Sequence, residues 1–244
     1  MTDPLDTLPV WLINLPRSTD RRARMEQRLA ALGLAYTLFP GVDGRAEEAR
    51  LLANTDIPAF ERNMGRKILI GGIGCYHSHL GVWETFLASG KPVALVLEDD
   101  VILSPDFGAV FQRALAEELA IREPHVTFLG CGGHYYVPRA EIEPGRLLYR
   151  RDQGKFADSY IIGLDAVKKR LQWIGEHGID RPIDHLFEAI DRETDTAMYW
   201  LEPPIVEQGS HNGRFRSALD VSHPLWFQSL QFRWKKLWRR KLRA

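Results

Sequence analysis

Short apolar runs alternate along the chain with longer stretches of helical periodicity. Residues 10–14 and 93–97 are dominated by apolar side chains, which is typical of strands covered on both faces of a parallel sheet. Residues 18–32 repeat apolar side chains at helical spacing, and Gly33 marks the end of this helix. Further strands are predicted at residues 35–39, 126–129, 147–149, 159–162 and 197–201, and further helices at residues 47–53, 71–89, 166–175 and 182–190.

Local signals set the expected boundaries of the later elements. Ser104 is suited to cap a helix whose first turn contains Pro105, and Asp165 and Pro182 are suited to begin two more helices. Residues 203–213, PPIVEQGSHNG, are expected to form a loop. Strands that alternate with helices predict an α/β domain, in which ligands bind beyond the carboxyl ends of the strands.

Three adjacent carboxylates, Glu98, Asp99 and Asp100, follow directly on the apolar run 93–97. Like charges held at the end of a buried strand repel one another and resist desolvation, so a compensating charge is expected. A divalent cation is the first candidate, and a solvated strand end is the alternative. Because successive side chains of an extended segment point in opposite directions, Glu98 and Asp100 should share one side.

The composition is that of a globular protein: of 244 residues, 45% are hydrophobic and 26% are charged, which excludes bulk disorder. No apolar run approaches the roughly 20 residues of a membrane-spanning helix. Asp3 and Asp6 stand where a signal peptide would be basic, and the two cysteines, Cys75 and Cys131, lack metal-type spacing. We therefore expect a cytoplasmic protein with reduced cysteines.

The C-terminal segment 224–244 differs from the rest in charge, since it holds seven Lys or Arg and no acid. The preceding residues carry 25 basic against 32 acidic side chains, a net charge of −7. Aromatic and leucine side chains recur at helical spacing in the segment, which predicts a helix lying in an anionic membrane surface. Packing of this helix onto the acidic body is the alternative, and no fold feature favours nucleic-acid binding.

Several longer motifs occur in a fixed order along the chain. They are VWLINLPRSTDRRARM, the VDG turn, GIGCYHSHLGVWETFL and VALVLEDDVIL, followed by DSYIIGLDAVKKRL, PIDHLF and LEPPIVEQ. In order and approximate spacing, over residues 10–210, they resemble glycosyltransferase family 25, which includes lipopolysaccharide and lipooligosaccharide galactosyltransferases. The resemblance implies a Rossmann-like α/β fold of the GT-A type, with a mostly parallel central sheet flanked by helices.

The resemblance also implies an activity. This is the inverting, metal-dependent transfer of a hexose, galactose from UDP-galactose in the first place, to a lipopolysaccharide or other glycan acceptor. The catalytic domain would then be residues 1–222, followed by the basic aromatic tail at residues 223–244. An acceptor carried on a lipid would make contact of this tail with the inner face of the cytoplasmic membrane useful.

Individual residues acquire expected roles from the same resemblance. Asp184 matches a family aspartate and would take the proton of the acceptor hydroxyl or bind the acceptor, although the helix dipole alone also favours an aspartate at a helix start. Asp100 and Glu98 would hold Mn²⁺ or Mg²⁺, and His211 could complete the site. The residues expected to bind the donor are Asn14, Leu15, Arg17, Arg21, Asp43, Gly44, Ser78, His79, Glu98 and Asp99.

Other roles stay open at the level of the sequence. Ser78 and His79 could equally cap or pack, and the tyrosines of the loop GCGGHYYVPR could bind sugar or pack inside. Gly72 stands where the family usually has Glu. The alternative function is therefore a non-catalytic module that binds a sugar nucleotide or a membrane surface. A metal-dependent phosphohydrolase is less well supported, because no DxDxT-type motif follows any predicted strand.

Overall fold

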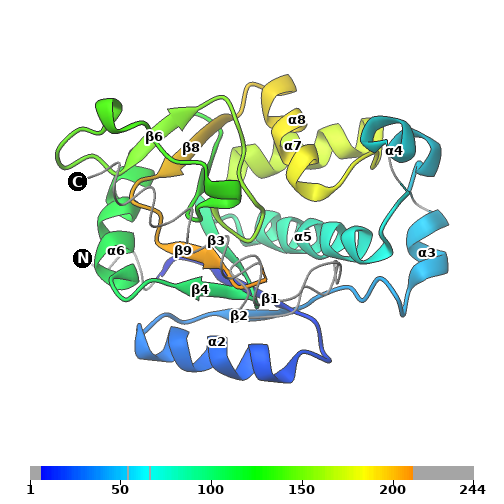
Figure 1. The fold of residues 1–244 in the computed structure, drawn as a ribbon, viewed down its shortest axis with the longest axis horizontal. Coiled ribbons are helices and arrows are strands. Elements are labelled where there is room, and N and C mark those ends of the chain that lie inside the picture. The colour runs from blue at the N-terminus through cyan, green and yellow to red at the C-terminus, as the bar shows by residue number, and fades with distance from the viewer. Residues whose placement is uncertain (1–6, 54, 66, 211–244) are drawn as a thin grey trace.

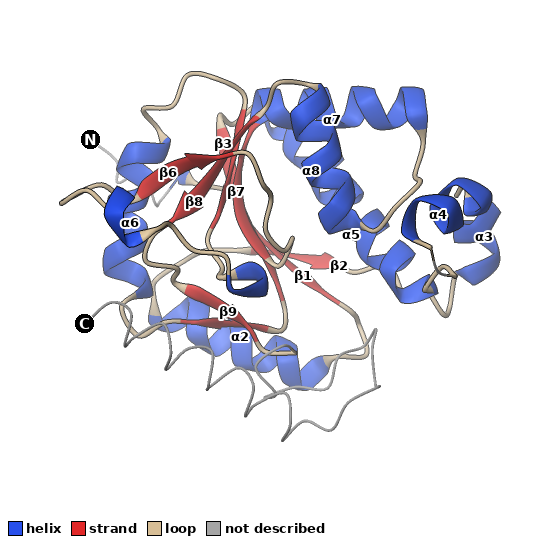
Figure 2. Ribbon diagram, turned by 45° about the horizontal axis from the view of Figure 1, so that its top comes forward, coloured by secondary structure: helices blue, strands red, loops and turns tan. Residues whose placement is uncertain are grey.

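The computed structural model describes residues 7–53, 55–65 and 67–210. Seven strands form one sheet in the order β2-β1-β3-β7-β5-β8-β6, with helices on both faces (Figures 1 and 2). A separate two-stranded ribbon pairs β4 with β9. The strands are β1 (Val10–Asn14), β2 (Thr37–Pro40), β3 (Val93–Glu98), β4 (Val101–Leu103), β5 (His125–Phe128), β6 (Leu148–Arg151), β7 (Ser159–Gly163), β8 (Ala197–Leu201) and β9 (Val206–Gln208).

The large sheet is mixed. β1 pairs in parallel with β2 and β3, and β5 pairs in parallel with β8. β7 is antiparallel to both β3 and β5, and β6 is antiparallel to β8. The α/β class and the Rossmann-like architecture are thus confirmed, with β7 separating the parallel groups. Because β7 runs in the opposite direction, its first residues lie at the edge where β1, β3 and β5 end.

The helices cover the two faces of the sheet with separate cores. Val93, Leu95 and Leu97 pack with α2 and α6, whereas Ala94 and Val96 pack with α5, α7 and α8. The apolar run of β3 is therefore covered on both faces, as its composition predicts. The helices are α2 (Thr19–Ala31), α3 (Glu48–Ala53), α4 (Ile57–Met64), α5 (Ile70–Ser89), α6 (Phe107–Glu118), α7 (Leu164–His177) and α8 (Ile183–Glu193).

A buried ion pair and its ring contacts join α5, α7 and α8, the helices that cover one face of the sheet. Arg170 of α7 donates from Nε and Nη2 to the two carboxylate oxygens of Asp191 of α8, at 2.8 and 2.6 Å, and both side chains are fully buried. The Arg170 guanidinium also lies over the rings of Trp83 on α5 and Phe187 on α8. These contacts hold α8 in place and with it Asp184 in its first turn.

The predicted start of the helix after β3 was wrong. Residues 101–103 form β4, and the Ser104 backbone N–H donates to Ile205 O at 2.8 Å next to β9. α6 consequently begins after Asp106, which occupies its N-cap. Residues 206–208, expected to be loop, form β9. Both errors arise because β4 and β9 are stabilised by each other and not by local sequence.

Two further helix starts depart from expectation. Asp165 lies inside the first turn of α7, whose N-cap is Gly163. The sequence pattern does not predict α4, which begins where Asp56 Oδ1 accepts a hydrogen bond from Ala59 N at 2.9 Å. α3 and α4 lie between β2 and α5, where Leu51 and Phe60 share a small apolar cluster with the start of α5.

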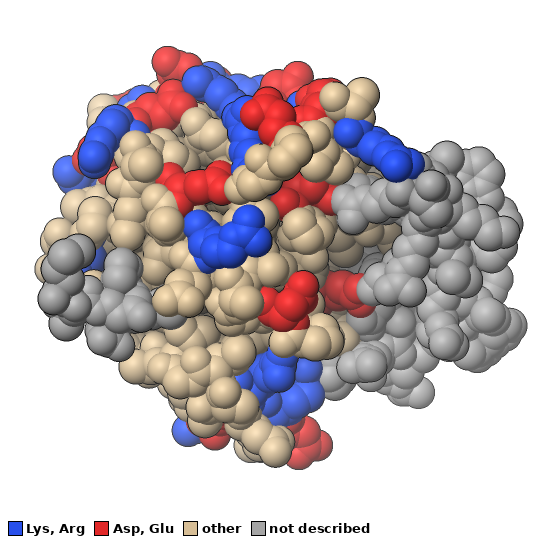
Figure 3. Space-filling view, turned by 90° about the vertical axis from the view of Figure 1, so that its left-hand side faces the viewer, with Lys and Arg blue, Asp and Glu red and all other residues tan. Residues whose placement is uncertain are grey.

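Within the described residues, no helix combines the length and apolar character needed to cross a bilayer. On the face that carries α6 and β6, acidic and basic side chains are interspersed (Figure 3). Arg150 and Arg151 of β6 form ion pairs with Glu123 and Glu141, at 3.1 and 2.7 Å. These charges therefore neutralise one another locally. The tail expected at residues 223–244 lies outside the described residues.

Candidate active site

Glu98 is the last residue of β3, and Asp99 and Asp100 form the turn to β4, at the edge where the parallel strands end. Glu98 points toward α5, and Asp99 points toward the end of β1 and toward α2. Asp100 is buried, and the Ser210 side chain hydrogen-bonds to it. Because Asp99 and Asp100 form a turn, the strict alternation expected for an extended segment does not hold beyond Glu98, and the charges of both Glu98 and Asp99 act on Asp100.

Asp99 is held by the first strand and helix. Its carboxylate accepts hydrogen bonds from Asn14 Nδ2 at 2.6 Å and from Arg21 Nη1 at 3.2 Å. Burial raises the pKa of Asp99, and these two partners oppose that rise only in part. Arg24 of α2 donates to the Asp99 and Val101 carbonyls. Asn14 and Arg21, two residues with expected donor roles, thus both bind Asp99, a third, and hold the acidic turn.

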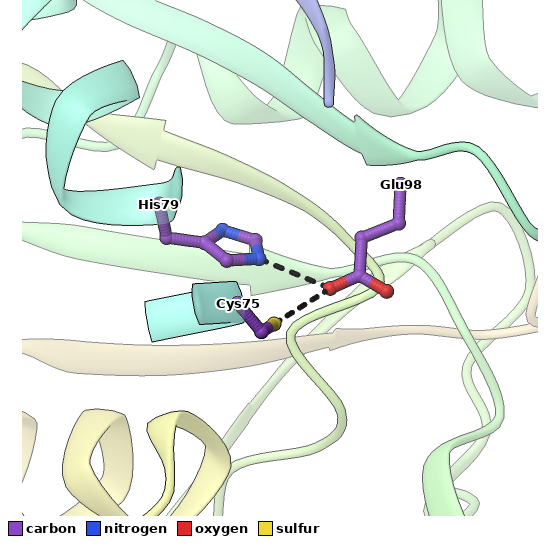
Figure 4. Close-up of side chains that lie close together, drawn as sticks. All are labelled: Cys75, His79 and Glu98. Atoms are coloured by element: carbon purple, nitrogen blue, oxygen red, sulfur yellow. Dashed lines mark hydrogen bonds and ion pairs between the residues drawn. The ribbon is translucent and has the colours of Figure 1, made fainter. Parts of the chain in front are cut away.

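A chain of hydrogen bonds runs from Trp83 through Tyr160 and His79 to Glu98. Trp83 Nε1 donates to the Tyr160 hydroxyl at 3.0 Å, and this hydroxyl lies 2.8 Å from His79 Nδ1. His79 Nε2 and Cys75 Sγ lie 3.1 and 3.3 Å from Glu98 Oε1 (Figure 4). Burial alone would raise the pKa of Glu98, but hydrogen bonds from His79 and Cys75 outweigh it, so its pKa is lowered. His79 therefore orients an ionised Glu98.

Asp158 and Asp184 lie near Glu98 and Asp100, and these four residues are called the acidic cluster. Asp184, in the first turn of α8, accepts a hydrogen bond at Oδ1 from Ala157 N at 2.7 Å. Burial, opposed by this hydrogen bond and reinforced by Glu98, raises its pKa to about 6. Asp158 precedes β7 and accepts a hydrogen bond from Ser159 Oγ at 2.9 Å. Burial and the charge of Glu98 raise the pKa of Asp158 well above its usual value.

Sequence reasoning did not select Asp158. The expected site residues at the sheet edge follow predicted strands, whereas Asp158 precedes one. Its place becomes clear from β7: Ser159 pairs with Leu97 in an antiparallel register, and the Asp158 carbonyl accepts from Glu98 N at 2.8 Å. The signal available in the sequence is the aspartate at the start of the DSYIIG motif.

The acidic cluster fits a hard divalent cation. Asp100 Oδ1 is buried, and none of the described groups hydrogen-bonds to it. Burial, followed by the charge of Glu98, raises the pKa of Asp100 to about 7. Such a group is destabilised as an anion, and a cation with a preference for carboxylate oxygens would remove this penalty. His211, expected as a further ligand, lies outside the described residues.

The turn after β2 is packed tightly on the start of α5. Ser78 Oγ accepts from Val42 N at 2.8 Å and donates to Gly74 O at 2.7 Å, so Ser78 has the packing role that the sequence left open. A Cβ on Gly44 would lie 2.2 Å from Ile70 O, so only glycine fits there. Asp43, in the same turn, forms an ion pair with Arg17.

The turn after β1 and the loop after β5 contain the remaining candidate residues, Leu15 and the tyrosines. The Leu15 carbonyl accepts from Ser18 N at 2.8 Å in the turn that joins β1 to α2. In the loop after β5, Tyr135 stacks on Trp200 with 6.0 Å between ring centroids and is still 42% exposed. Tyr135 therefore packs on one side and presents its other side to solvent.

Comparison with known proteins identifies the family. Residues 7–131, about half of the chain, match the family model described as glycosyltransferase family 25 (LPS biosynthesis protein). The chain belongs to glycosyltransferase family 25. The resemblance noted from its motifs is therefore confirmed.

Several relatives of this family 25 domain are known. A glycosyltransferase 25 family member of Anopheles gambiae is 28% identical over 70% of the chain and 29% of that protein. Procollagen galactosyltransferase 1 of Danio rerio is 31% identical over 70% of the chain and 29% of that protein. Inactive glycosyltransferase 25 family member 3 of Mus musculus is 28% identical over 78% of the chain and 34% of that protein. The chain thus spans about a third or less of the length of these relatives.

Gly72→Glu, which introduces the usual family residue, is expected to stabilise this family 25 domain by about 0.5–1 kcal/mol. Gly72 lies in the first turn of α5, where a Cβ would meet nothing within 4 Å. Glu has a higher helix propensity than Gly, and its charge is favourable at a helix N-terminus. Urea unfolding followed by circular dichroism measures the change in free energy.

Gly74→Ala is the matched control in the same helix. Its Cβ would lie 2.5 Å from Val42 O and 2.7 Å from Gly44 N, so this substitution should destabilise the domain. Equal destabilisation by Gly72→Glu would show that the space around position 72 is not open.

Proposed function

We propose that the chain is an inverting hexosyltransferase that moves galactose from UDP-galactose to a hydroxyl of a lipopolysaccharide or other glycan acceptor. Family membership supports a transferase, and the family description refers to lipopolysaccharide biosynthesis. A relative is named as a galactosyltransferase, which supports the choice of sugar. The observation that carries the proposal is the cluster of Glu98, Asp100, Asp158 and Asp184 at the carboxyl edge of the sheet.

Asp100 and Glu98 would hold Mn²⁺ or Mg²⁺, joined by His211. When bound, the cation would neutralise the charge that grows on the diphosphate as UDP leaves. Asp99 then acts as the anchor of the acidic turn, through Asn14 and Arg21. The remaining donor contacts are assigned to Leu15, Arg17, Asp43 and Gly44, in the turns after β1 and β2.

Asp184 would be the general base. The hydrogen bond from Ala157 N fixes its Oδ1, and Oδ2 would accept the proton of the acceptor hydroxyl as that oxygen attacks the anomeric carbon. A carboxyl group with a pKa of about 6 is ionised at neutral pH and is more basic than an exposed aspartate. The attack breaks the bond between the sugar and UDP, with inversion at the anomeric carbon.

A panel of UDP-sugars, incubated with the full chain and Mn²⁺, tests the proposal through release of UDP. UDP-galactose should give the fastest release, and EDTA should stop it. Two observations favour the alternative of a non-catalytic binding module: Gly72 replaces the usual glutamate, and a relative is named inactive. Binding of a UDP-sugar without release of UDP under any acceptor would support that alternative and contradict the transferase.

The tail at residues 224–244 is proposed to dock the protein on the inner face of the cytoplasmic membrane. Seven basic residues near an anionic surface contribute about 1 kcal/mol each, which can offset repulsion of a body at −7. Full-length chain should therefore sediment with phosphatidylglycerol vesicles at low salt and less at high salt. A chain truncated to residues 1–222 should stay in the supernatant.

The truncated chain also separates membrane docking of the tail from the alternative, packing of the tail as a helix on the body. Equal sedimentation of both chains would exclude the tail as the anchor. Loss of solubility on truncation, with no vesicle binding by the full chain, would indicate a helix packed on the body.

A further inference from the structure

Cys75, His79 and Glu98 bring three different ligand atoms together. The sulfur, imidazole nitrogen and carboxylate oxygen all lie within 4.8 Å of one another. Cys75 and His79 are separated by one turn of α5 and so share a helix face, and Glu98 approaches from the end of β3 (Figure 4). In the described part of the chain, this is the one group of three such residues whose ligand atoms lie this close.

The distances suit a tetrahedral ion with a sulfur ligand. His79 Nε2 and Cys75 Sγ lie 3.1 and 3.3 Å from Glu98 Oε1. Zinc bonds of about 2.0 Å to nitrogen and oxygen and about 2.3 Å to sulfur place such ligand atoms about 3.3–3.6 Å apart. Two of the three distances between ligand atoms therefore lie within a few tenths of an ångström of those required, and the third, between Cys75 Sγ and His79 Nε2, is within 4.8 Å. Thiolate and imidazole ligands also favour zinc over manganese or magnesium.

The surroundings of the cluster hold the ligands in place. The Tyr160 hydroxyl lies 2.8 Å from His79 Nδ1 and is itself fixed by Trp83 Nε1 at 3.0 Å. A partner on the second nitrogen orients a histidine whose first nitrogen binds metal. The Cys75 residue as a whole is partly exposed.

We propose that Cys75, His79 and Glu98 form a second cation site, which takes a thiophilic divalent cation of the zinc class. On binding, the Cys75 thiol releases its proton to solvent, and His79 carries its proton on Nδ1, where it is donated to the Tyr160 oxygen. The site uses the same Glu98 that is proposed to help hold the hard cation. Occupation by zinc should therefore inhibit transfer, a consequence that rests on the proposed function, whereas zinc binding itself does not.

Titration of the full chain with Co²⁺, used as a spectroscopic substitute for Zn²⁺, tests the site directly. One equivalent should produce a sulfur-to-cobalt charge-transfer band in the near ultraviolet, and Zn²⁺ should displace it. Cys75→Ser should lose the band, while Cys131→Ser, which alters the other cysteine of the chain, should keep it. Tyr160→Phe should weaken Zn²⁺ binding by about 10-fold, because it removes the partner that orients His79.

The wild-type titration alone can overturn the proposal, since absence of the band needs no variant to interpret. A band that persists in Cys75→Ser and disappears in Cys131→Ser would place the metal elsewhere. Asp100→Asn should retain the band, because Asp100 does not belong to this site. The cobalt titration measures metal binding and not activity. Its outcome therefore does not depend on whether the chain releases UDP in the transferase assay.

Discussion

Asp100→Asn is expected to reduce kcat/KM by roughly 10²- to 10³-fold, equivalent to about 3–4 kcal/mol of lost transition-state stabilisation. The substitution keeps the shape of the side chain and removes the charge proposed to hold the cation. The fold should remain intact, because asparagine keeps an oxygen that can accept the Ser210 hydrogen bond, and none of the described groups hydrogen-bonds to Asp100 Oδ1. Steady-state release of UDP at saturating Mn²⁺ measures the loss.

The same variant has a pH signature in unfolding experiments without added cation. The pKa of Asp100 rises from 3.8 to about 7 on folding, through burial and then the charge of Glu98. Between these values the folded chain keeps a proton that the unfolded chain has lost, so the free energy of unfolding falls as pH rises. Asparagine does not titrate, so the stability of Asp100→Asn relative to wild type should increase across this window.

Asp165→Asn is the matched control for Asp100→Asn. Asp165 is an exposed carboxylate in the first turn of α7 that pairs with Lys168, beyond the opposite end of β7. Its loss should leave UDP release unchanged. Full activity of Asp100→Asn in EDTA would contradict the cation site at Asp100.

Asp184→Asn is expected to lower kcat by about 10²- to 10⁴-fold with little change in donor binding. Asparagine can still accept the Ala157 hydrogen bond at Oδ1, so the start of α8 should keep its position. What is lost is the group that takes the proton of the acceptor hydroxyl. Kinetics with varied donor, together with direct measurement of UDP-sugar affinity, separate the two effects.

The pH dependence of kcat/KM gives a second test of Asp184. A general base works only when ionised, so activity should rise with pH up to the pKa of Asp184, about 6, and then level off. A bound cation nearby would lower this pKa, which places the midpoint at or below 6. Asp184→Asn should lack this acid limb.

Glu188→Gln is the matched control on the same helix. Glu188 also accepts a hydrogen bond from a backbone N–H, that of Gly154 at 3.2 Å, and its loss should leave kcat unchanged. If Asp184→Asn instead loses UDP-sugar binding and stability together, Asp184 serves only to start the helix.

The sequence by itself determined the α/β class, most strands and helices, and the position of the acidic triplet at a strand end. These features depend on local patterns. The five apolar residues of 93–97 require cover on both faces, and the helical period of α2 is visible within its own segment. The family followed from the order of the motifs, which needs no geometry.

The tertiary structure alone decided how the site is assembled. The antiparallel direction of β7 brings Asp158 to the acidic edge, and long-range pairing creates β4 and β9. The positive charge of Arg21 is matched by Asp99 within the chain, and His79 and Tyr160 meet across the α5 face of the sheet. Each of these contacts joins segments distant in sequence, and its free energy depends on burial and neighbouring charge. Those two quantities exist only once the chain has folded, so no local pattern encodes them.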